Sequence, residues 1–393
     1  MIIKTAGKAL LCRILEAQVR RLRRRNQFTI VAVAGSVGKT STKLAIASLL
    51  SSNSRVMYQD GNYNDRLTVP LVLFGQAEPG IYNVWSWLKI LLANQRVLSQ
   101  PYPYDMAVLE LGTDGPGQLA KFAYLKPEIV VITAVAPEHM EFFGDLDAVA
   151  KEELAPLNYS KEALLNVDDI PARFITSSPA YSYGQDSNAR YRLTATKSHN
   201  LAGQTLDMTL GGTGAIKVET SLIGQPGAKI VLAAAAVADM LQWPVERIQA
   251  AITEIKPVTG RMRVLAGAAG STLIDDTYNS SPSAALSALD VLFQAPAKQR
   301  IAILGSMNEL GRQGPAAHRQ VGAYCQADKL DLLVTIGADA EKYLAPVAGC
   351  EVKSFASPYE AGEFVSKRLK PDTVVLAKGS EQGLCRRSSQ TVT

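Results

Sequence analysis

The segment that most constrains this chain is residues 29–43, because it reads as a buried strand, a glycine turn and the start of a helix. Five apolar residues, 30–34, precede Gly35-Ser-Val-Gly-Lys-Thr, and a helical run begins at Ser41. Glycines at such a turn let backbone N–H groups approach an anion. The segment therefore predicts a nucleotide site rather than a bare glycine turn. The residues expected to bind the nucleotide are Gly35, Ser36, Val37, Gly38, Lys39, Thr40 and Ser41.

Two side chains of this loop carry the expected chemistry. Lys39 can reach the β- and γ-phosphates, and the Thr40 hydroxyl can hold Mg²⁺. A full P-loop has a further glycine at the position that Val33 occupies here. The shorter Gly-x-x-Gly-Lys-Thr form is less specific by itself, so the prediction depends on the strand before it and the helix after it.

Length and composition place the chain among globular proteins. Its 393 residues predict two or three domains, with 47% hydrophobic and 20% charged residues. No apolar run reaches the ~18 residues of a membrane span, and no secretory signal with a cleavage site is evident. The four cysteines are scattered without metal-ligand spacing, which indicates reduced thiols. We therefore expect a cytoplasmic protein.

The net charge of +5 is concentrated at the N-terminus. Residues 1–28 hold eight Lys and Arg against one acid, Glu16, so this segment is +7 and the remainder sums to −2. The body is not a nucleic-acid binder by charge. Residues 2–25 are predicted to be helical, with apolar residues at helical spacing. Two interpretations remain open: a helix packed on the body with a solvated basic end, or a helix that contacts a membrane surface or an anionic ligand. The apolar positions are Leu11, Ile14, Leu15, Val19 and Leu22.

The remaining pattern predicts two α/β domains. Strands at 105–111, 128–133 and 163–167 alternate with helices such as 145–155, which is typical of a mostly parallel, doubly wound sheet. Residues 181–222 alternate polar and apolar around turns, so they predict a small antiparallel insertion, and a long helix is expected at 228–242. A linker at 256–262 places a domain boundary near 258. Further strands at 272–275, 300–304, 331–336 and 373–377 predict a smaller Rossmann-like α/β domain.

This organisation divides the chain into three parts: a basic helix at 1–28, an ATP-binding domain at 29–258 and a C-terminal domain at 259–393. The tail from Glu381 to Thr393 is polar and shows no clear helix pattern.

Glu110 ends the predicted strand 105–111. A carboxylate at the carboxyl end of a strand beside a P-loop is a common Mg²⁺ ligand, and a half-buried edge carboxylate is the alternative. His139 follows the strand 128–133, and a lone histidine there would by itself be a structural residue.

The motifs, taken in order, resemble the Mur ligase family from about residue 29 to about residue 380. The Gly-Ser-Val-Gly-Lys-Thr-Ser loop is similar to the variant P-loop of that family. Within the family, the motifs are most similar to members that add D-alanyl-D-alanine to a UDP-linked muramoyl tripeptide. They are Gly61-Asn-Tyr-Asn with Val69-Pro-Leu, Leu109-Glu-Leu-Gly, Glu138-His-Met-Glu-Phe-Phe-Gly, Asp275-Asp-Thr-Tyr-Asn-Ser-Ser-Pro, and Leu304-Gly-Ser-Met-Asn-Glu-Leu-Gly with His318.

The resemblance implies an ATP-dependent amide ligase of peptidoglycan biosynthesis. A substrate carboxylate becomes an acyl phosphate, and an amine then attacks it, a reaction that depends on charge neutralisation and alignment. The implied catalytic residues are Lys39, Glu110, His139 and Arg261, with Arg261 reaching the nucleotide when the C-terminal domain closes. Further implied nucleotide contacts are Asp276, Tyr278 and Asn279, whereas His318 is expected to be structural.

Four departures from the family pattern matter. Only the basic segment precedes the P-loop, where the family carries a UDP-binding domain, and the stretch 223–230 lacks the family's His-Asn and Asn residues. The tail after Lys378 also differs. The lysine that many members carbamylate to hold a second metal falls, in register, at Glu153. Glu153 is therefore a fourth candidate metal ligand beside Thr40, Glu110 and His139, and a solvated helix residue is the alternative.

The expected partners are a small-molecule or lipid-linked cell-wall precursor and an amino acid or dipeptide, with ATP and Mg²⁺ as cofactors and no nucleic acid. Residues 1–25 could add peripheral contact with the inner face of the membrane. One alternative within the family is a ligase that acts on a lipid-linked or other acceptor. An alternative of another class is a non-catalytic nucleotide-binding partner subunit, against which the retained Lys39, Thr40, Glu110, His139 and Arg261 argue.

Overall fold

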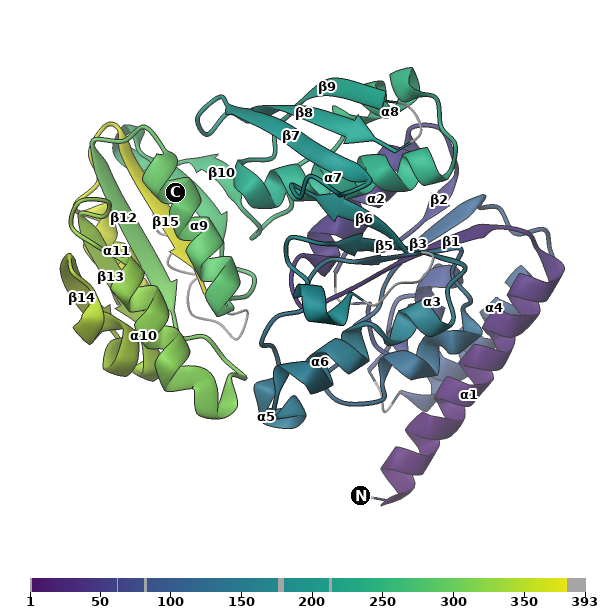
Figure 1. Ribbon diagram of the computed structural model, residues 1–393. Coiled ribbons are helices and arrows are strands. Elements are labelled where there is room, and N and C mark those ends of the chain that lie inside the picture. The colour runs from purple at the N-terminus through teal and green to yellow at the C-terminus, as the bar shows by residue number, and fades with distance from the viewer. Residues whose placement is uncertain (1, 62, 81–82, 176–179, 212–213, 380–393) are drawn as a thin grey trace.

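The computed structural model describes residues 2–61, 63–80, 83–175, 180–211 and 214–379. Within them, a nine-stranded sheet and a six-stranded sheet form two lobes that lie side by side (Figure 1). The larger lobe contains the N-terminal two thirds of the chain. The polar tail 381–393 lies outside the described residues.

The nine-stranded sheet is parallel on one side and antiparallel on the other. β1 (Thr29–Ala34) lies between β3 (Met106–Glu110) and β4 (Ile129–Ile132), parallel to both. All but the first residue of β1 are buried, as expected for a parallel strand covered on both faces. In full, the order is β2 (Val56–Met57), β3, β1, β4, β5 (Glu162–Asn166), β6 (Ala180–Gly184), β7 (Tyr191–Ser198), β8 (Gln204–Leu210) and β9 (Gly214–Thr220).

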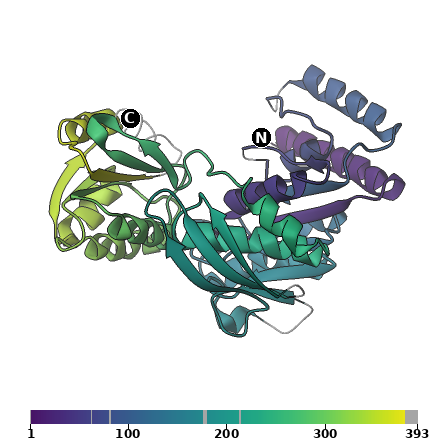
Figure 2. The ribbon, with the colours of Figure 1, turned by 90° about the horizontal axis from the view of Figure 1, so that it is seen from above.

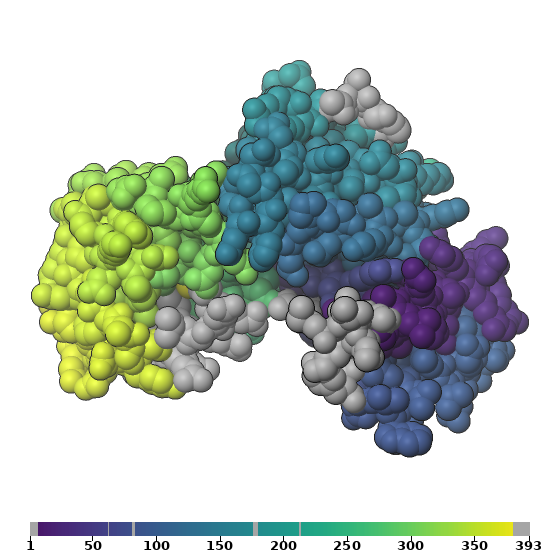
Figure 3. Space-filling view, turned by 90° about the horizontal axis from the view of Figure 1, so that it is seen from below, coloured from purple at the N-terminus to yellow at the C-terminus, as the bar shows by residue number. Residues whose placement is uncertain are grey.

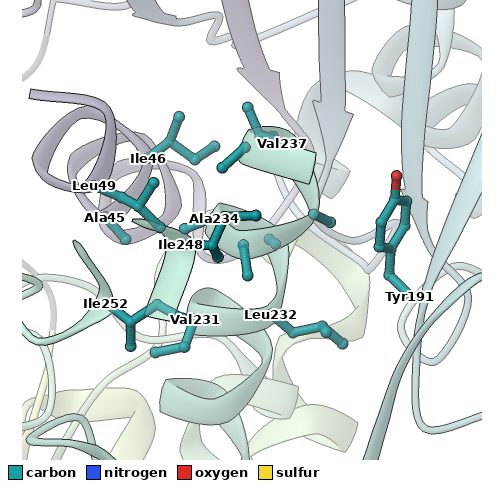
Figure 4. Close-up of a cluster of buried hydrophobic side chains, with 14 of the residues drawn as sticks. Ala45, Ile46, Leu49, Tyr191, Val231, Leu232, Ala234, Val237, Ile248 and Ile252 are labelled. Carbon is teal, nitrogen blue, oxygen red and sulfur yellow. The ribbon is translucent and has the colours of Figure 1, made fainter. Parts of the chain in front are cut away.

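Helices cover both faces of this sheet. On one face, α2 (Lys39–Ser51), α7 (Gly224–Met240) and α8 (Val245–Ile252) pack together through apolar side chains, and Tyr191 of a strand belongs to the same buried cluster (Figure 4). Alanines 233–236 of α7 are fully buried, and these small side chains let α7 lie close to the sheet and to α2. The other face is covered by α3 (Thr68–Leu73), α5 (Met140–Phe143), α6 (Leu146–Glu153) and α1 (Ile2–Arg25).

α1 packs on the body through one side only. Leu15, Val19 and Leu22 are fully buried, so α1 is packed on the body, and contact of its other side with a membrane stays a prediction. Ile14 does not belong to that side: its side chain is 38% exposed, because it faces α4 (Val84–Leu98) and solvent. None of the helices in the described ranges is long and apolar enough to cross a bilayer.

The six-stranded sheet has its last strand near its centre. β15 (Thr373–Lys378) pairs in parallel with both β11 (Thr272–Asp276) and β12 (Gln299–Gly305). The order is β10 (Arg263–Ala266), β11, β15, β12, β13 (Leu332–Ile336) and β14 (Glu351–Phe355). α9 (Pro282–Gln294) and α10 (Gly314–Tyr324) pack on one face, and α11 (Pro358–Ser366) packs on the other.

The predicted fold class is confirmed, with three corrections. Residues 181–222 are antiparallel only from β7 to β9, because β6 pairs with β5 in parallel and extends the main sheet. The edge strands β10 and β14 were not predicted. Neither was α4, which packs against α1 through a cluster that includes Cys12, Trp87 and Ile90.

Candidate functional site

A cleft of ≈880 Å³ separates the two lobes, and residues from both sheets line it. The carboxyl ends of β1, β3 and β4 open into it from the larger lobe, and the end of β11 opens into it from the smaller one. Ligands of doubly wound sheets bind at this end of the strands. Every residue from Ser36 to Ser41 lines the cleft, together with Glu110, His139, Arg261, Asp276, Tyr278 and Asn279.

The P-loop lies between β1 and α2 in a backbone conformation that needs its glycines. Gly35 and Gly38 have φ of +119° and +86°, and a Cβ on Gly35 would lie 2.5 Å from Thr133 Oγ1. Neighbouring strands hold the loop: Ser36 N donates to Ala134 O at 2.9 Å. This strand–turn–helix geometry directs the N-terminus of α2 at the cleft, where it favours an anion.

Lys39 lies among carboxylates at the base of the loop. Its Nζ is 3.6 Å from Glu138 Oε1. Burial alone would lower the pKa of Lys39, but Glu138, Glu153 and Glu110 outweigh burial and raise it. Lys39 is therefore charged at neutral pH, as a phosphate-binding lysine must be.

Glu110 is buried at the end of β3, one strand from the P-loop. Its Oε2 lies 3.5 Å from Nζ of Lys43, and its Oε1 accepts from Asn64 Nδ2 at 3.3 Å. Lys43 is itself 2% exposed, and it also donates to Gln59 O at 2.8 Å. The alternative of a half-buried edge carboxylate is wrong for Glu110, which is only 3% exposed and paired with a buried cation.

His139 connects the two lobes. Its Nε2 lies 3.3 Å from Glu138 Oε1, and its Nδ1 lies 2.6 Å from Oε2 of Glu309, in the smaller lobe. The hydrogen bond to Glu138 raises the pKa of His139 against the effect of burial, and the charges of Glu138 and Glu309 add to the rise. His318, in contrast, is fully buried and bonded to backbone at both ring nitrogens, as expected of a structural histidine.

Glu153 is not a solvated helix residue, because it is 3% exposed and lies against the P-loop. Its Oε2 accepts a hydrogen bond from Gly35 N at 2.7 Å. Burial raises the pKa of Glu153 to about 7. Its neighbour Glu152 is also buried, and accepts from Gly117 N and Leu119 N, both at 2.6 Å.

The smaller lobe contributes an arginine to the P-loop. Arg261 Nη2 donates to Thr40 Oγ1 at 3.0 Å, and the guanidinium lies 3.9 Å from the ring centroid of Tyr278. Asp276 beside it accepts from Lys378 Nζ at 2.6 Å, and this buried lysine also donates to Asn279 O at 3.0 Å. One ion pair thus holds the segment 276–279 against the end of β15.

The residues of the cleft fit a phosphate-bound Mg²⁺. No group of three His, Cys, Asp or Glu side chains suited to a metal ion occurs in the described ranges, but Mg²⁺ needs only one or two carboxylates beside phosphates and waters. Among the described residues, Glu138 Oε2 is buried without a hydrogen-bond partner, and Glu110 Oε2 has only its ion pair with Lys43. These oxygens, with the Thr40 hydroxyl, are the donor types that Mg²⁺ prefers. Their role as ligands stays a prediction.

Comparison with known proteins identifies the family. A model of the Mur ligase middle domain matches residues 89–238, and a model of the Mur ligase glutamate ligase domain matches residues 260–381. The UDP-N-acetylmuramoyl-tripeptide–D-alanyl-D-alanine ligase of Synechocystis is 31% identical over 91% of this chain and 73% of its own length. The chain belongs to the Mur ligase family.

Further relatives agree with this assignment. The Escherichia coli ligase of the same name is 30% identical over 78% of this chain and 64% of its own length. The MurF ligase from Thermotoga maritima, solved in complex with ADP, has the same fold, with a TM-score of 0.80 at 22% identity over 97% of this chain and 83% of its own. As a Mur ligase, the protein is an ATP-dependent enzyme that forms carbon–nitrogen bonds, with ATP and Mg²⁺ as cofactors.

The structure brings every predicted site residue to the cleft or its P-loop wall, and adds partners that sequence reasoning did not single out. These are Lys43, Glu138 and Glu309. Two of them had a detectable signal: Lys43 follows Lys39 by four residues, one helical turn further along, and Glu138 directly precedes His139. Glu309 lies within the motif that begins at Leu304, but nothing local indicated its contact with His139, which lies 170 residues earlier in the chain.

Proposed function

We propose that this ligase joins D-alanyl-D-alanine to the terminal carboxylate of a UDP-N-acetylmuramoyl-tripeptide in the cytoplasm. One observation carries the proposal: Lys39 and Thr40 of one lobe meet Arg261 and Tyr278 of the other at a single cleft. Lys39 and Arg261 thus place one positive charge on each side of the cleft, which suits transfer of a phosphoryl group between two bound substrates. The choice of substrates is supported by the 31% identity to the Synechocystis ligase.

The proposed reaction has two steps. The γ-phosphoryl group of ATP passes to the carboxylate, which gives an acyl phosphate and ADP. The amine of the dipeptide then attacks the acyl carbon, loses a proton, and expels phosphate to leave an amide. Both steps move negative charge between oxygens, so the fixed positive groups of the cleft stabilise them more than covalent help could.

The residues divide this work by position. Lys39 and the amides of the P-loop hold the phosphates, and Arg261 adds a charge from the smaller lobe when the cleft is closed. His139, between Glu138 and Glu309, is placed to orient the carboxylates around the transferring group. Bound Mg²⁺ would neutralise phosphate charge, and Thr40, Glu110 and His139 would hold it directly or through its waters. Glu153 would contribute to a second Mg²⁺.

The test is amide formation itself. The protein would be incubated with ATP, Mg²⁺, the UDP-linked tripeptide and D-alanyl-D-alanine, with product followed by mass spectrometry and phosphate by release assay. We expect sustained phosphate release only when acceptor and dipeptide are both present, because the acyl phosphate accumulates without the amine. The proposal would be contradicted if phosphate were released at the same rate without acceptor and dipeptide, or if no amide formed when both were present.

A second candidate is a ligase of the same type whose acceptor is lipid-linked. The exposed apolar and basic side of α1 favours it, because that side could bring the enzyme to a membrane. The same assay distinguishes the two candidates when a lipid-linked muramoyl tripeptide replaces the UDP-linked one. A non-catalytic partner subunit would form no amide with either acceptor.

A further inference from the structure

α1 and α4 form a two-helix layer at the end of the molecule opposite the six-stranded sheet (Figures 2 and 3). Hydrogen bonds between the helices fix their relative position. Asn94 Nδ2 donates to Gln18 Oε1 at 2.8 Å, and Gln18 Nε2 donates to Leu91 O at 3.2 Å. Arg25 of α1 reaches the end of α4, where it donates to Leu98 O at 2.9 Å. The outer surface of this layer is therefore a defined, preformed surface.

That outer surface is apolar at its centre. Trp85 is 76% exposed, Leu92 is 66% exposed and Leu88 is 46% exposed, and their spacing places them on one side of α4. Of the ten large hydrophobic side chains exposed among the described residues, six lie on these two helices. Single exposed leucines are ordinary, whereas a cluster marks an interaction surface. We call the six residues the α1–α4 face: Leu10, Ile14, Val84, Trp85, Leu88 and Leu92.

A groove of ≈520 Å³ lies between the two helices and contributes to this face. Ile14 and Gln18 line it from α1, and Trp85, Leu88 and Leu92 line it from α4. No residue of the α1–α4 face lines the catalytic cleft. A ligand on this face would therefore leave the nucleotide site open.

The rim of the face is mainly basic, although Asp65 lies 3.8 Å from Lys8 Nζ beside α1. Residues 79–104 contain no Asp or Glu, and the only acid in residues 7–25 is Glu16, which is buried and lies 2.5 Å from Arg66 Nε. Basic side chains are exposed on both helices. They are Lys8, Arg13, Arg20, Arg21, Arg24, Arg25, Lys89 and Arg96.

We propose that the α1–α4 face docks the enzyme on the surface of an anionic lipid bilayer. Helices with Trp and Leu on one side and Lys and Arg around them lie in the plane of a bilayer, with the apolar side chains at the acyl boundary and the cations at the headgroups. Tryptophan in particular favours this interface. The proposal does not depend on which acceptor the ligase uses.

The charge argues against a second copy of this chain as the occupant. A two-fold interface would place the same surface on both sides, so two mainly basic rims would face one another. An anionic bilayer satisfies the apolar centre and the basic rim together.

The intrinsic fluorescence of the protein offers a direct test. The chain has three tryptophans, and Trp87 and Trp243 are buried at 5% and 7% exposure. Only Trp85 can enter a lipid environment. With vesicles of phosphatidylcholine containing about a quarter phosphatidylglycerol, we expect a blue shift of the emission. The shift should be absent with pure phosphatidylcholine vesicles and should weaken as the salt concentration rises.

Co-sedimentation with the same vesicles separates the apolar and charged contributions. The triple variant Trp85→Ser/Leu88→Ser/Leu92→Ser should lose binding. The triple variant Arg13→Gln/Arg24→Gln/Lys89→Gln should bind about a hundredfold more weakly, because each basic residue near the surface contributes about a factor of five. A matched control, Lys197→Gln/Lys353→Gln/Lys370→Gln, removes the same charge from exposed sites elsewhere and should bind as the wild type does.

Two further measurements make the outcome decisive. Trp85→Phe should sediment with vesicles but show no blue shift, and all variants should keep the wild-type thermal midpoint because the replaced side chains are exposed. The proposal is overturned if the wild type ignores anionic vesicles, or if it binds them and both triple variants on the α1–α4 face bind equally well. It is also overturned if the wild type is a dimer that does not bind lipid, and if the triple Ser substitution converts that dimer to a monomer.

Discussion

Arg261 donates a hydrogen bond to the hydroxyl of Thr40 at 3.0 Å, although the two residues lie 221 positions apart in the chain. The same guanidinium covers the ring of Tyr278, so it is held from the smaller lobe while it contacts the larger one. Thr40 is the residue expected to hold Mg²⁺. The arginine is therefore placed to couple the position of the lobes to the state of the nucleotide site.

Arg261→Ala should lower kcat more than it weakens ATP binding. The arginine contacts the P-loop only when the lobes are together, so its charge contributes mainly to the transition state, at a cost of about a hundredfold in kcat when removed. Steady-state kinetics and nucleotide titration would measure the two effects. Arg263→Ala is a matched control, because Arg263 is exposed and bonds to the side chain of Thr259. A loss of ATP affinity as large as the loss of kcat would argue against a closure role.

Lys39→Ala and Lys43→Ala should fail in different ways. Lys39→Ala should abolish turnover in a folded protein, because no other lysine of the loop reaches the phosphates. Lys43→Ala should instead cost about 3 kcal/mol or more of stability, because it leaves Glu110 buried without its cation. Urea denaturation with parallel rate assays would separate the two. Adding Glu110→Gln to Lys43→Ala should restore part of the stability and none of the activity. Wild-type turnover in Lys39→Ala would remove the P-loop assignment.

The free energy of unfolding should depend on Glu153 and on pH. The folded protein holds the pKa of Glu153 at about 7, above the ordinary 4.5. Between these values the unfolded chain loses a proton that the folded chain keeps, so stability falls as pH rises through this window. Glu153→Gln cannot ionise and can still accept from Gly35. It should be more stable than the wild type by about 3 kcal/mol at alkaline pH and equal to it near pH 4, in thermal unfolding without nucleotide.

The same position gives a prediction about metal dependence. If Glu153 takes the place of a carbamylated lysine, the enzyme should not need bicarbonate, and Glu153→Gln should raise the Mg²⁺ concentration needed for turnover. Glu153→Lys should recover activity only with bicarbonate. Lys151→Gln, at an exposed site two residues away, should behave as the wild type. Unchanged rates and Mg²⁺ dependence in Glu153→Gln would exclude a role of Glu153 in metal binding and leave only its hydrogen bond to the P-loop.

Closure of the lobes should weaken as pH rises, because His139 is held by Glu309 across the cleft. The folded protein raises the pKa of His139, chiefly through the hydrogen bond to Glu138. Glu138 acts on His139 whether the lobes are open or closed, so only the part of the rise due to Glu309 favours closure, and it is lost as pH rises through the raised pKa. Energy transfer between dyes on the two lobes, without Mg²⁺, would report the closed fraction. Glu309→Gln should lower the closed population about threefold at low pH, and the exposed control Glu360→Gln should not.

Sequence reasoning predicted the elements whose signal is local. β1, β4 and β12 are apolar runs bounded by polar or glycine-containing turns, and each is buried on both faces. β14 is an edge strand with the sequence Glu-Val-Lys-Ser-Phe and two half-buried residues, so it offered no apolar run. α4 carries apolar residues on both sides, one against α1 and one outward, which hides the helical period that a one-sided amphipathic helix would show.

The candidate site divides in the same way. Lys39, Glu110 and His139 stand at strand ends or within motifs, where their neighbours in sequence indicate their role. Glu309 and the link between Glu153 and Gly35 depend on pairs that are 170 and 118 residues apart, and such pairs exist only once the sheets and the interface between the lobes have formed. A single sequence does not show which residues so far apart in the chain meet in the folded protein.

The central place of β15 has a consequence for how the protein is made. The strands of the larger lobe have all left the ribosome once residue 220 has emerged, so that sheet can pair while translation continues. In the smaller lobe, β11 and β12 lack their shared neighbour until residues 373–378 appear. The edges of β11 and β12 that pair with β15 therefore stay unpaired during about a quarter of synthesis. Premature termination before residue 373 should yield a chain whose larger lobe is folded and whose smaller lobe lacks its β15. Such a chain should be bound by chaperones or degraded by proteases.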